Sequence, residues 1–141
     1  MKHHRVLRVI TKLLIPYILL FALYVQFHGD FGPGGGFQAG VIFASAFILY
    51  GLVFGLRYAK QVAPPDLIER FVGIGLLLYA GTGVAGMLLG GEFLNYFVLA
   101  ADPQAGQHYG ILLVEAGVGI TVAATMITIF YYFAGRAPGE D

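Results

Sequence analysis

Four long runs of apolar residues constrain this chain more than any other feature of its sequence. They cover about residues 9–27, 36–56, 68–89 and 109–133. At about 1.5 Å of rise per helical residue, each run can cross a hydrocarbon core of about 30 Å. Backbone groups inside a bilayer must satisfy their own hydrogen bonds, so such spans are helical. The sequence therefore predicts an all-α integral membrane bundle of four transmembrane helices, with residues 1–141 forming a single membrane domain.

The composition supports a membrane protein and excludes several classes of function. Hydrophobic residues make up 58% of the chain and charged residues 11%, with a mean hydropathy of +0.78, which is far too apolar for an ordinary soluble domain. The chain has no cysteine, which excludes disulfides, thiolate metal sites and cysteine nucleophiles. Its formal net charge is zero, so no basic field favours nucleic acid as a partner. We expect its partners in the bilayer.

The basic residues predict the orientation of the chain. With four spans, the N-terminus, the middle loop and the C-terminus share one side of the membrane. All eight lysines and arginines lie in or beside these segments: Lys2, Arg5, Arg8, Lys12, Arg57, Lys60, Arg70 and Arg136. The positive-inside rule places this side, with both termini, in the cytoplasm. The sequence thus predicts a multi-pass protein of the cell (inner or plasma) membrane.

The first two spans are joined by a polar, glycine-dense turn. Residues 28–40 read His-Gly-Asp-Phe-Gly-Pro-Gly-Gly-Gly-Phe-Gln-Ala-Gly. Pro33 fixes its own φ and donates no hydrogen bond, while Gly34–Gly36 allow positive φ or the close approach of another chain. Helix is expected from Phe37 onward, so free amides lie at a helix N-terminus, where partial positive charge gathers. The turn is therefore predicted to be a shaped break that can hold an anion, a carboxylate or a carbonyl group.

Small residues form stripes on two of the spans. Gly36, Gly40 and Ala44 share one face of the second span, where they let a neighbouring backbone approach closely. The third span is also rich in glycine: Gly73, Gly75, Gly81, Gly83 and Gly86. Membrane helices tolerate glycine when their neighbours pack tightly. We expect both spans to be packed closely against other helices, including those of other proteins.

Aromatic residues predict surfaces at the edge of the bundle. On the second span they repeat every three or four residues, which favours a ridge facing lipid or a partner: Phe43, Phe47, Tyr50 and Phe54. The last span ends in Tyr131, Tyr132 and Phe133, which is typical of an interfacial aromatic belt.

Two connecting segments are expected to leave the hydrocarbon. Residues 57–70 are predicted to form a short charged loop, in which Asp66 and Glu69 make a capping box that opens the third helix. Residues 90–108 contain no lysine or arginine and are predicted to form the second loop on the outer side.

Glu115 is the one acidic residue in the interior of a predicted span. Because a charge in hydrocarbon is costly, an intramembrane carboxylate is either functional or paired within the protein. Gly119 and Val122 share its helical face, so a second backbone can come close to it. Two hypotheses stay open. Glu115 handles a proton or a cation, or it only holds helices together, bonded to the amides near Gly35.

Other polar residues give weaker signals. His28, at the outer end of the first span, can relay protons because its unperturbed pKa is about 6.5, or it bonds to backbone at the membrane edge. His108 has the same two interpretations. A second polar stripe contains Thr121, Thr125 and Thr128. Threonines in membrane helices usually bond their own i−4 carbonyls, so conduction is the alternative interpretation for this stripe.

No enzyme active site can be assembled from these residues. The glycine-rich turn lacks the preceding strand and the following Lys-Ser/Thr pair of a phosphate-binding loop. The sequence shows no His/Asp/Glu set at metal-ligand spacing and no nucleophile, base and orienting group that could form a triad. We expect no catalysis, no metal and no cofactor.

Two motifs carry a family resemblance. The run of residues 28–40 and the run Val-Glu-Ala-Gly-Val-Gly-Ile-Thr-Val at residues 114–122 resemble the B subunit of the Mrp (Mnh) multisubunit Na⁺/H⁺ antiporters. The resemblance covers the four spans in order, and the Pro-Gly-Gly-Gly-Phe turn is its most specific element. It implies a subunit without its own catalytic turnover, assembled with other Mrp subunits in a machine that exchanges Na⁺ for H⁺.

The resemblance also implies site residues. The candidates for the ion or proton pathway are Glu115 and His28, and the structural motif consists of Pro33, Gly34, Gly35, Gly36, Phe37 and Gly40. The main hypothesis is an accessory antiporter subunit that contributes to assembly and to the ion or proton pathway. The alternative is a purely structural helix-packing subunit of a related membrane-bound hydrogenase-type ion-pumping complex. An independent homo-oligomeric channel is disfavoured, because one buried charge offers little for a pore.

Overall fold

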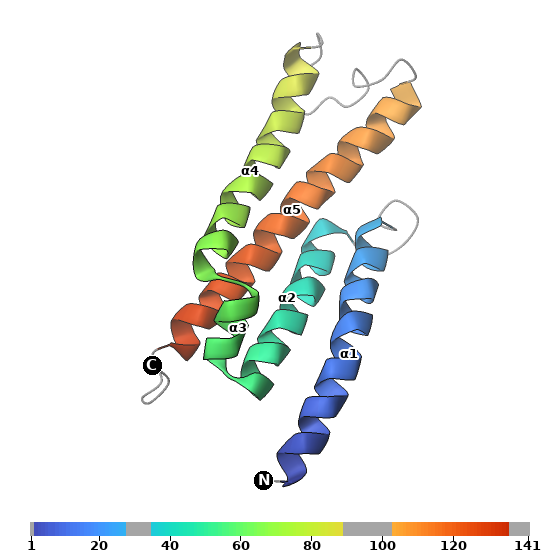
Figure 1. Ribbon diagram of the computed structural model, residues 1–141. Helices are drawn as coiled ribbons and strands as arrows, with labels where there is room; N and C mark the ends of the chain where they lie inside the picture. Colours follow the sequence, from blue (N-terminus) through green and yellow to red (C-terminus); the bar gives the residue numbers. More distant parts are fainter. Residues whose placement is uncertain (1, 28–34, 89–102, 136–141) are drawn as a thin grey trace.

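The computed structural model describes residues 2–27, 35–88 and 103–135, and all regular structure in these residues is helical. The helices are α1 (Lys2–Phe27), α2 (Gly36–Phe54), α3 (Leu56–Val62), α4 (Pro65–Leu88) and α5 (Pro103–Ala134) (Figure 1). By length and composition, α1, α2, α4 and α5 can each cross a membrane. The predicted all-α fold with four spans is therefore confirmed.

The long helix α5 is the centre of the bundle. It packs against α4 on one side and α2 on the other, while α1 packs mainly against α2 (Figure 1). The start of α1, the end of α2, the start of α4 and the end of α5 lie toward one end of the bundle. At the opposite end, α4 and α5 extend beyond α1 and α2. The end of α1, the start of α2 and the middle of α5 lie side by side.

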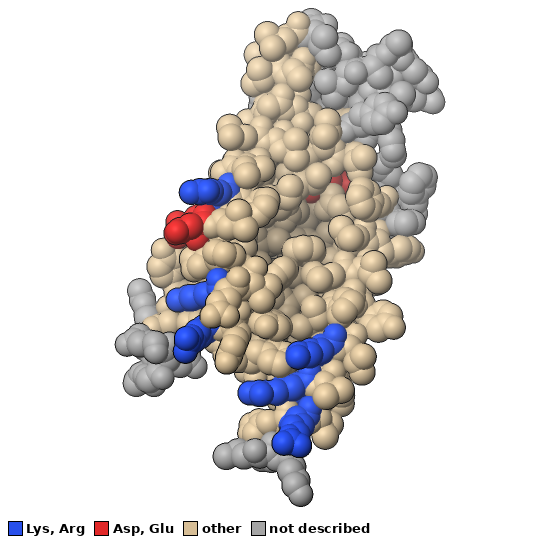
Figure 2. All heavy atoms as spheres, viewed as in Figure 1, with Lys and Arg blue, Asp and Glu red and all other residues tan. Residues whose placement is uncertain are grey.

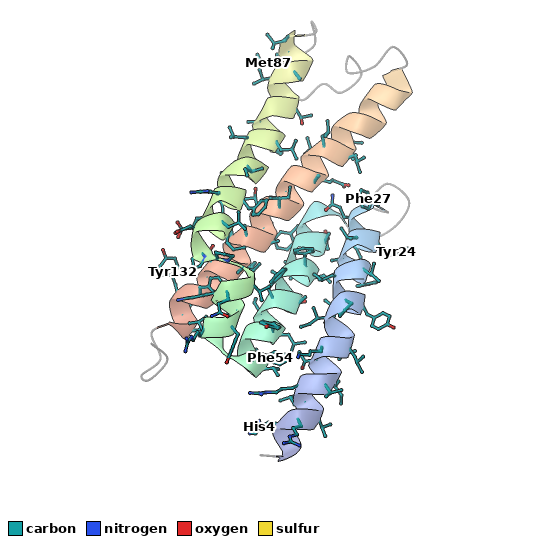
Figure 3. All side chains as sticks on the ribbon, in the orientation of Figure 1. His4, Tyr24, Phe27, Phe54, Met87 and Tyr132 are labelled. Atoms are coloured by element: carbon teal, nitrogen blue, oxygen red, sulfur yellow. The ribbon has the colours of Figure 1, made fainter. Side chains whose placement is uncertain are left out.

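The outer surface of this bundle is apolar. Figure 3 shows Tyr24 and Met87 projecting away from the bundle, and the two side chains are 57% and 52% exposed. Many other large apolar side chains of α1 and α4 are exposed in the same way. A soluble protein would bury such a surface, whereas a bilayer solvates it.

Two helices begin before the spans predicted for them. Helix α1 begins at Lys2, before the span predicted from about residue 9, and α5 begins at Pro103, before the span predicted from about residue 109. Hydropathy marks the stretch that hydrocarbon can solvate, but a helix continues into polar residues as long as its backbone hydrogen bonds continue. Part of the predicted 90–108 loop is therefore the first part of α5, and residues 89–102 lie outside the described residues.

The predicted charged loop at residues 57–70 also contains a helix. Gly55 has a φ of +103°, a conformation that L side chains rarely adopt, and the chain leaves α2 there and enters α3. Leu56 and Ala59 of α3 are buried, whereas Arg57 and Tyr58 are exposed. This short helix is amphipathic. Its charged residues made the segment look like a loop in the sequence, so the buried face was not predicted.

The capping box predicted at Asp66 and Glu69 was wrong as well. Helix α4 begins at Pro65, so Asp66 lies inside its first turn and not at the N-cap. Proline suits the first helical position because its missing N–H has no partner within the helix there. Asp66 still lies where the helix dipole favours an acidic side chain.

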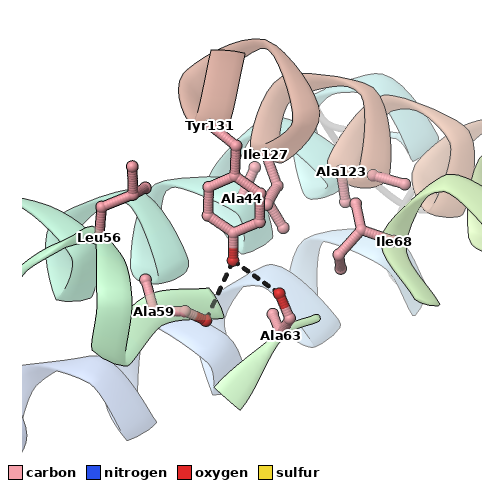
Figure 4. Packing of buried hydrophobic residues seen from close by; sticks show 9 residues of the cluster. Ala44, Leu56, Ala59, Ala63, Ile68, Ala123, Ile127 and Tyr131 are labelled. Carbon is pink, nitrogen blue, oxygen red and sulfur yellow. Dashed lines mark hydrogen bonds between the residues drawn. The ribbon is translucent and has the colours of Figure 1, made fainter. Parts of the chain in front are cut away.

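The core is built largely of small residues from four helices. It contains Ala44, Leu56, Ala59, Ala63, Ile68, Ala123, Ala124, Ile127 and Tyr131 (Figure 4). Alanines at these positions let helix backbones approach closely, which is the main source of packing energy between helices in a membrane. Phe43, Phe47 and Tyr50 are partly buried against this core. The ridge predicted to face lipid or a partner therefore faces the inside of this chain along most of its length.

Tyr131 ties α3 to α5. Its ring is only 6% exposed, and its hydroxyl lies 2.8 Å from the carbonyl oxygen of Ala63 and 3.1 Å from that of Ala59 (Figure 4). These carbonyls lie at the end of α3, and that of Ala59 also accepts the backbone N–H of Ala63 at 2.9 Å. The aromatic belt was thus wrong for Tyr131, whereas Tyr132 and Phe133 are 61% and 71% exposed, as a belt requires.

We expect Tyr131→Phe to loosen α3 without disturbing the spans. Among the described residues, Tyr131 is the one donor that reaches the carbonyl of Ala63. The variant keeps the ring but removes this donor, and an unsatisfied buried acceptor costs about 1–3 kcal/mol. Amide hydrogen exchange in detergent should accelerate about fivefold to hundredfold across α3 and stay unchanged in α2. Tyr132→Phe removes a hydroxyl from an exposed ring and is the matched control. Equal exchange in α3 for both variants would contradict this role.

Candidate functional site

Polar groups from three helices meet where α2 begins. The meeting point consists of Gln26 of α1, Gly35 and Gly36 at the start of α2, and Glu115 and Gly119 of α5. We call these five residues the Glu115 junction. Glu115 lies inside the apolar part of α5, Gly110–Ala134, and its side chain is half-buried. The junction therefore places a carboxyl group within a membrane span.

Backbone contact between α2 and α5 positions the junction. A Cβ atom on Gly36 would overlap the carbonyl oxygen of Glu115 and would lie 3.1 Å from the Cα of Glu115. One turn further along α2, a Cβ atom on Gly40 would lie 2.7 Å from the carbonyl oxygen of Gly119. Only glycine permits this approach at either position. The predicted stripe of Gly36, Gly40 and Ala44 does pack closely, but against α5 of the same chain.

The carboxyl group of Glu115 lies beside the first residues of α2. A Cβ atom on Gly35 would be 3.5 Å from Oε1 of Glu115 and 3.4 Å from Oε1 of Gln38. The carbonyl oxygen of Gly35 accepts the N–H of Ala39 at 2.9 Å, so the helical hydrogen bonds start there. The amides of the first turn have no partner within the helix and carry partial positive charge. This end of α2 is therefore suited to a carboxylate, as the sequence predicted for Glu115 and the amides near Gly35.

Gln26 completes the junction from α1. Its Oε1 would lie 2.7 Å from a Cβ atom on Gly119, and the carbonyl oxygen of Gly36 would lie 3.3 Å from the same atom. Its Nε2 is buried and has no hydrogen-bond partner among the described residues. A buried amide without a partner is costly, so such groups often mark a functional site. Gln26 was not predicted as a site residue, although a lone amide in an apolar run was a signal.

The junction can perform simple chemistry with oxygen atoms. It brings together a carboxyl group, a side-chain amide and the carbonyl oxygen of Gly36 beside the N-terminus of a helix. Broken or newly started helices within membranes hold ions and protons in other transport proteins by the same combination of carbonyl oxygens and helix ends. Intramembrane carboxyl groups also act in proton relays.

Several predicted site residues can be compared with the structure only in part. His28, Pro33 and Gly34 lie outside the described residues. Gly35 has a φ of 179°, an extended conformation that any residue adopts. It therefore does not use the positive φ that glycine would allow. Phe37 is 61% exposed and lies on the surface, away from the buried part of the junction.

The threonine stripe does not join the junction. Thr128 donates its hydroxyl to the carbonyl oxygen of Ala124 at 2.8 Å, which confirms the predicted i−4 bond. Thr121 faces α4, where its Oγ1 would overlap a Cβ atom on Gly75. This oxygen is buried and has no hydrogen-bond partner in the described part of the chain. In residues 2–27, 35–88 and 103–135, no group of three or more His, Asp or Glu side chains could hold a metal ion.

Comparison with known proteins gives a consistent result. A family model described as a domain related to the MnhB subunit of Na⁺/H⁺ antiporter matches residues 6–128. The proposed antiporter subunit mnhB2 from Staphylococcus aureus strain Newman is 36% identical to this chain over 133 residues, which is 92% of this chain and 94% of the relative. The mnhB2 protein of strain JH1 matches with the same identity and coverage.

Proposed function

The chain belongs to the family of the MnhB subunit of Na⁺/H⁺ antiporters, and we propose that, as an accessory membrane subunit of such a multisubunit antiporter, it contributes Glu115 to the route of protons or Na⁺. The comparisons name antiporters, so they do not favour the hydrogenase-linked alternative. The protein is a multi-pass protein of the cell membrane. Its partners are other subunits of the antiporter.

One observation supports the ion-handling role most directly. The carboxyl group of Glu115 lies against Gly35 at the first turn of α2, inside a membrane span. The amides of this turn have no partner within the helix and can bond to the carboxyl group. Intramembrane carboxyl groups act in proton relays, so this carboxyl group is suited to binding and releasing a proton during a transport cycle. Gln26 is the second polar group that a passing proton or cation would meet.

We propose that this subunit has no catalytic turnover of its own and that the basic end of the bundle faces the cytoplasm. The basic side chains of the described residues lie in α1, α3 and the start of α4: Arg5, Arg8, Lys12, Arg57, Lys60 and Arg70. Figure 2 shows most of the blue side chains toward the end of the visible face where α1 begins and α5 ends, and one farther along, beside the acidic side chains. The positive-inside rule supports this orientation.

We expect Glu115→Gln to reduce Na⁺/H⁺ antiport at least about tenfold while the complex still assembles. Glutamine keeps the size of the side chain and can still bond to the amides of α2, but it cannot bind and release a proton. Antiport would be measured in inverted membrane vesicles from cells that produce the whole complex. Assembly would be measured by co-purification of the other subunits with the tagged chain.

Glu69→Gln is the matched control, because it makes the same chemical change at an exposed carboxylate in the first part of α4. This variant should keep normal antiport. If Glu115→Gln also keeps the normal rate and its normal dependence on pH, Glu115 only holds helices together and the ion-handling role is wrong.

A further inference from the structure

An apolar groove lies outside the Glu115 junction, between α1 and the α2–α3 pair. It has a volume of about 290 Å³. Pro16 and Leu19 of α1, Phe47 and Tyr50 of α2, and Val62 of α3 line it, and Lys12 lies at its end nearest the start of α1. The wall is almost wholly apolar apart from this lysine. A groove of this kind has two chemically different parts, a long apolar wall and a cationic mouth.

The mouth of the groove carries more than one positive charge. The ammonium group of Lys12 lies 5.4 Å from the ring centre of Phe54, and the guanidinium carbon of Arg8 lies 5.8 Å from the same ring. Arg8 and Lys12 are one turn apart, so they share a face of α1. Both cations make cation–π contacts with the ring of Phe54, the last residue of α2.

No carboxylate neutralises these charges within the groove. The described parts of α1, α2 and α3 contain no aspartate and no glutamate. In α4, the nearest acidic residues in sequence, Asp66 and Glu69, are exposed, and the hydroxyl of Tyr132 lies 3.4 Å from Glu69. The mouth is therefore complementary to an anion that approaches from the surface of the molecule.

We propose that this groove binds an anionic phospholipid, with one acyl chain along the apolar wall and the phosphate at Arg8 and Lys12. The stretch of α1 from Lys12 to Leu19 is about 10 Å long, whereas a helix of another protein is itself about 10 Å across and needs about 30 Å to cross the membrane. The groove is too short for such a helix but suits part of an acyl chain. The two cations select a lipid with a negative headgroup.

Native mass spectrometry of the full-length chain in mild detergent can test this site. The probes are dioleoyl phosphatidylglycerol and dioleoyl phosphatidylcholine, which share their acyl chains and differ in net charge. Each Lys or Arg near an anionic headgroup strengthens binding about fivefold, so we expect two of them to make phosphatidylglycerol bind about twenty-five-fold more tightly. The double variant Arg8→Gln/Lys12→Gln should lose this preference and bind both lipids equally.

Three further variants separate the site from general charge and from misfolding. Arg57→Gln/Lys60→Gln removes the same charge from α3 and should keep the preference. Arg8→Lys/Lys12→Arg keeps both charges and should also keep it. Val62→Trp enlarges a side chain that lines the groove, so it should weaken the binding of both lipids without removing a charge.

The proposal would be overturned by any of four results. The two lipids could bind equally to the unchanged protein. The α3 double variant could lose the preference as fully as the α1 variant, which would show a diffuse charge effect. Glycerol 3-phosphate could displace the lipid as well as an equal concentration of phosphatidylglycerol does, which would show a phosphate site without a role for the groove. If the purified antiporter complex carries a crosslinkable partner subunit in the groove and no lipid, the assignment to lipid is also wrong.

Discussion

Replacing Gly75 with leucine is expected to separate α4 from α5, whereas the same replacement at Gly73 should have little effect. A Cβ atom on Gly75 would overlap Oγ1 of Thr121 and would lie 2.7 Å from the carbonyl oxygen of Gly117 and 2.8 Å from the backbone nitrogen of Thr121. The hydroxyl can rotate, but the two backbone atoms cannot. The approach is equally close from the other side, because a Cβ atom on Gly117 would lie 2.8 Å from the carbonyl oxygen of Gly75. The two helices would therefore have to move apart along their contact. Overpacking of this kind costs about 1–3 kcal/mol or more.

Gly73 is the matched control, two residues away on the same helix. A Cβ atom there would meet nothing within 4 Å. Leucine at this position adds one more apolar side chain to a surface that is already apolar, and it raises helix propensity relative to glycine. The measurement is the monodisperse fraction of the isolated chain after size-exclusion chromatography in detergent, before and after a series of heating steps.

The Gly75→Leu variant should lose most of its monodisperse fraction at temperatures that the unchanged chain survives. The Gly73→Leu variant should follow the unchanged chain. Equal behaviour of the two variants would show that the contact between Gly75 and Gly117 does not hold α4 on α5. The isolated chain is used because contacts with other subunits would affect both variants.

This pair of glycines also shows what the sequence could predict. Glycine content predicted that the third span packs closely, and α4 does pack closely against α5. The sequence could not separate Gly75 from Gly73, because a helix that is apolar all round has no polar face to define its orientation. It also could not tell whether the neighbouring backbone belongs to the same chain. The stripe on α2 was predicted correctly as a contact surface and is used within the chain, by α5.

Of the two polar side chains of the Glu115 junction, the sequence predicted one. Glu115 stands out because an acidic residue in an apolar span is costly, and this argument needs no structure. Gln26 needed the structure, because its contact with Gly119 depends on how far α1 is shifted along α5. The helix α3 and the hydrogen bonds of Tyr131 were missed for a similar reason. They depend on the turn at Gly55, and a single glycine after an apolar run does not define how the chain continues.

Gly36→Ala should reduce antiport at least about tenfold, although it adds only one methyl group. The new Cβ atom would overlap the carbonyl oxygen of Glu115, so α2 must move away from α5 at the point where its first amides face the carboxyl group. Because effective positioning of reacting groups fails with shifts of about 1 Å, the carboxyl group would lose its place beside Gly35. Antiport would be measured in inverted vesicles, together with the amount of chain in the membrane.

Leu52→Ala is the matched control for this variant, because Leu52 lies on the same helix, outside the structural motif, and is 70% exposed. Its replacement removes a large side chain but leaves the contact between Gly36 and Glu115 intact, so antiport and assembly should be normal. Normal antiport in Gly36→Ala would show that the close approach of α2 is not needed for transport.

The assembly measurement then separates positioning from scaffolding. If the junction acts by positioning Glu115, Gly36→Ala and Glu115→Gln should share one result, which is lost antiport in an assembled complex. If the junction only holds the chain together, Gly36→Ala should lose antiport in proportion to the loss of co-purified subunits, while Glu115→Gln should lose neither. The two functions ascribed to Glu115 therefore predict opposite relations between transport and assembly across this pair of variants.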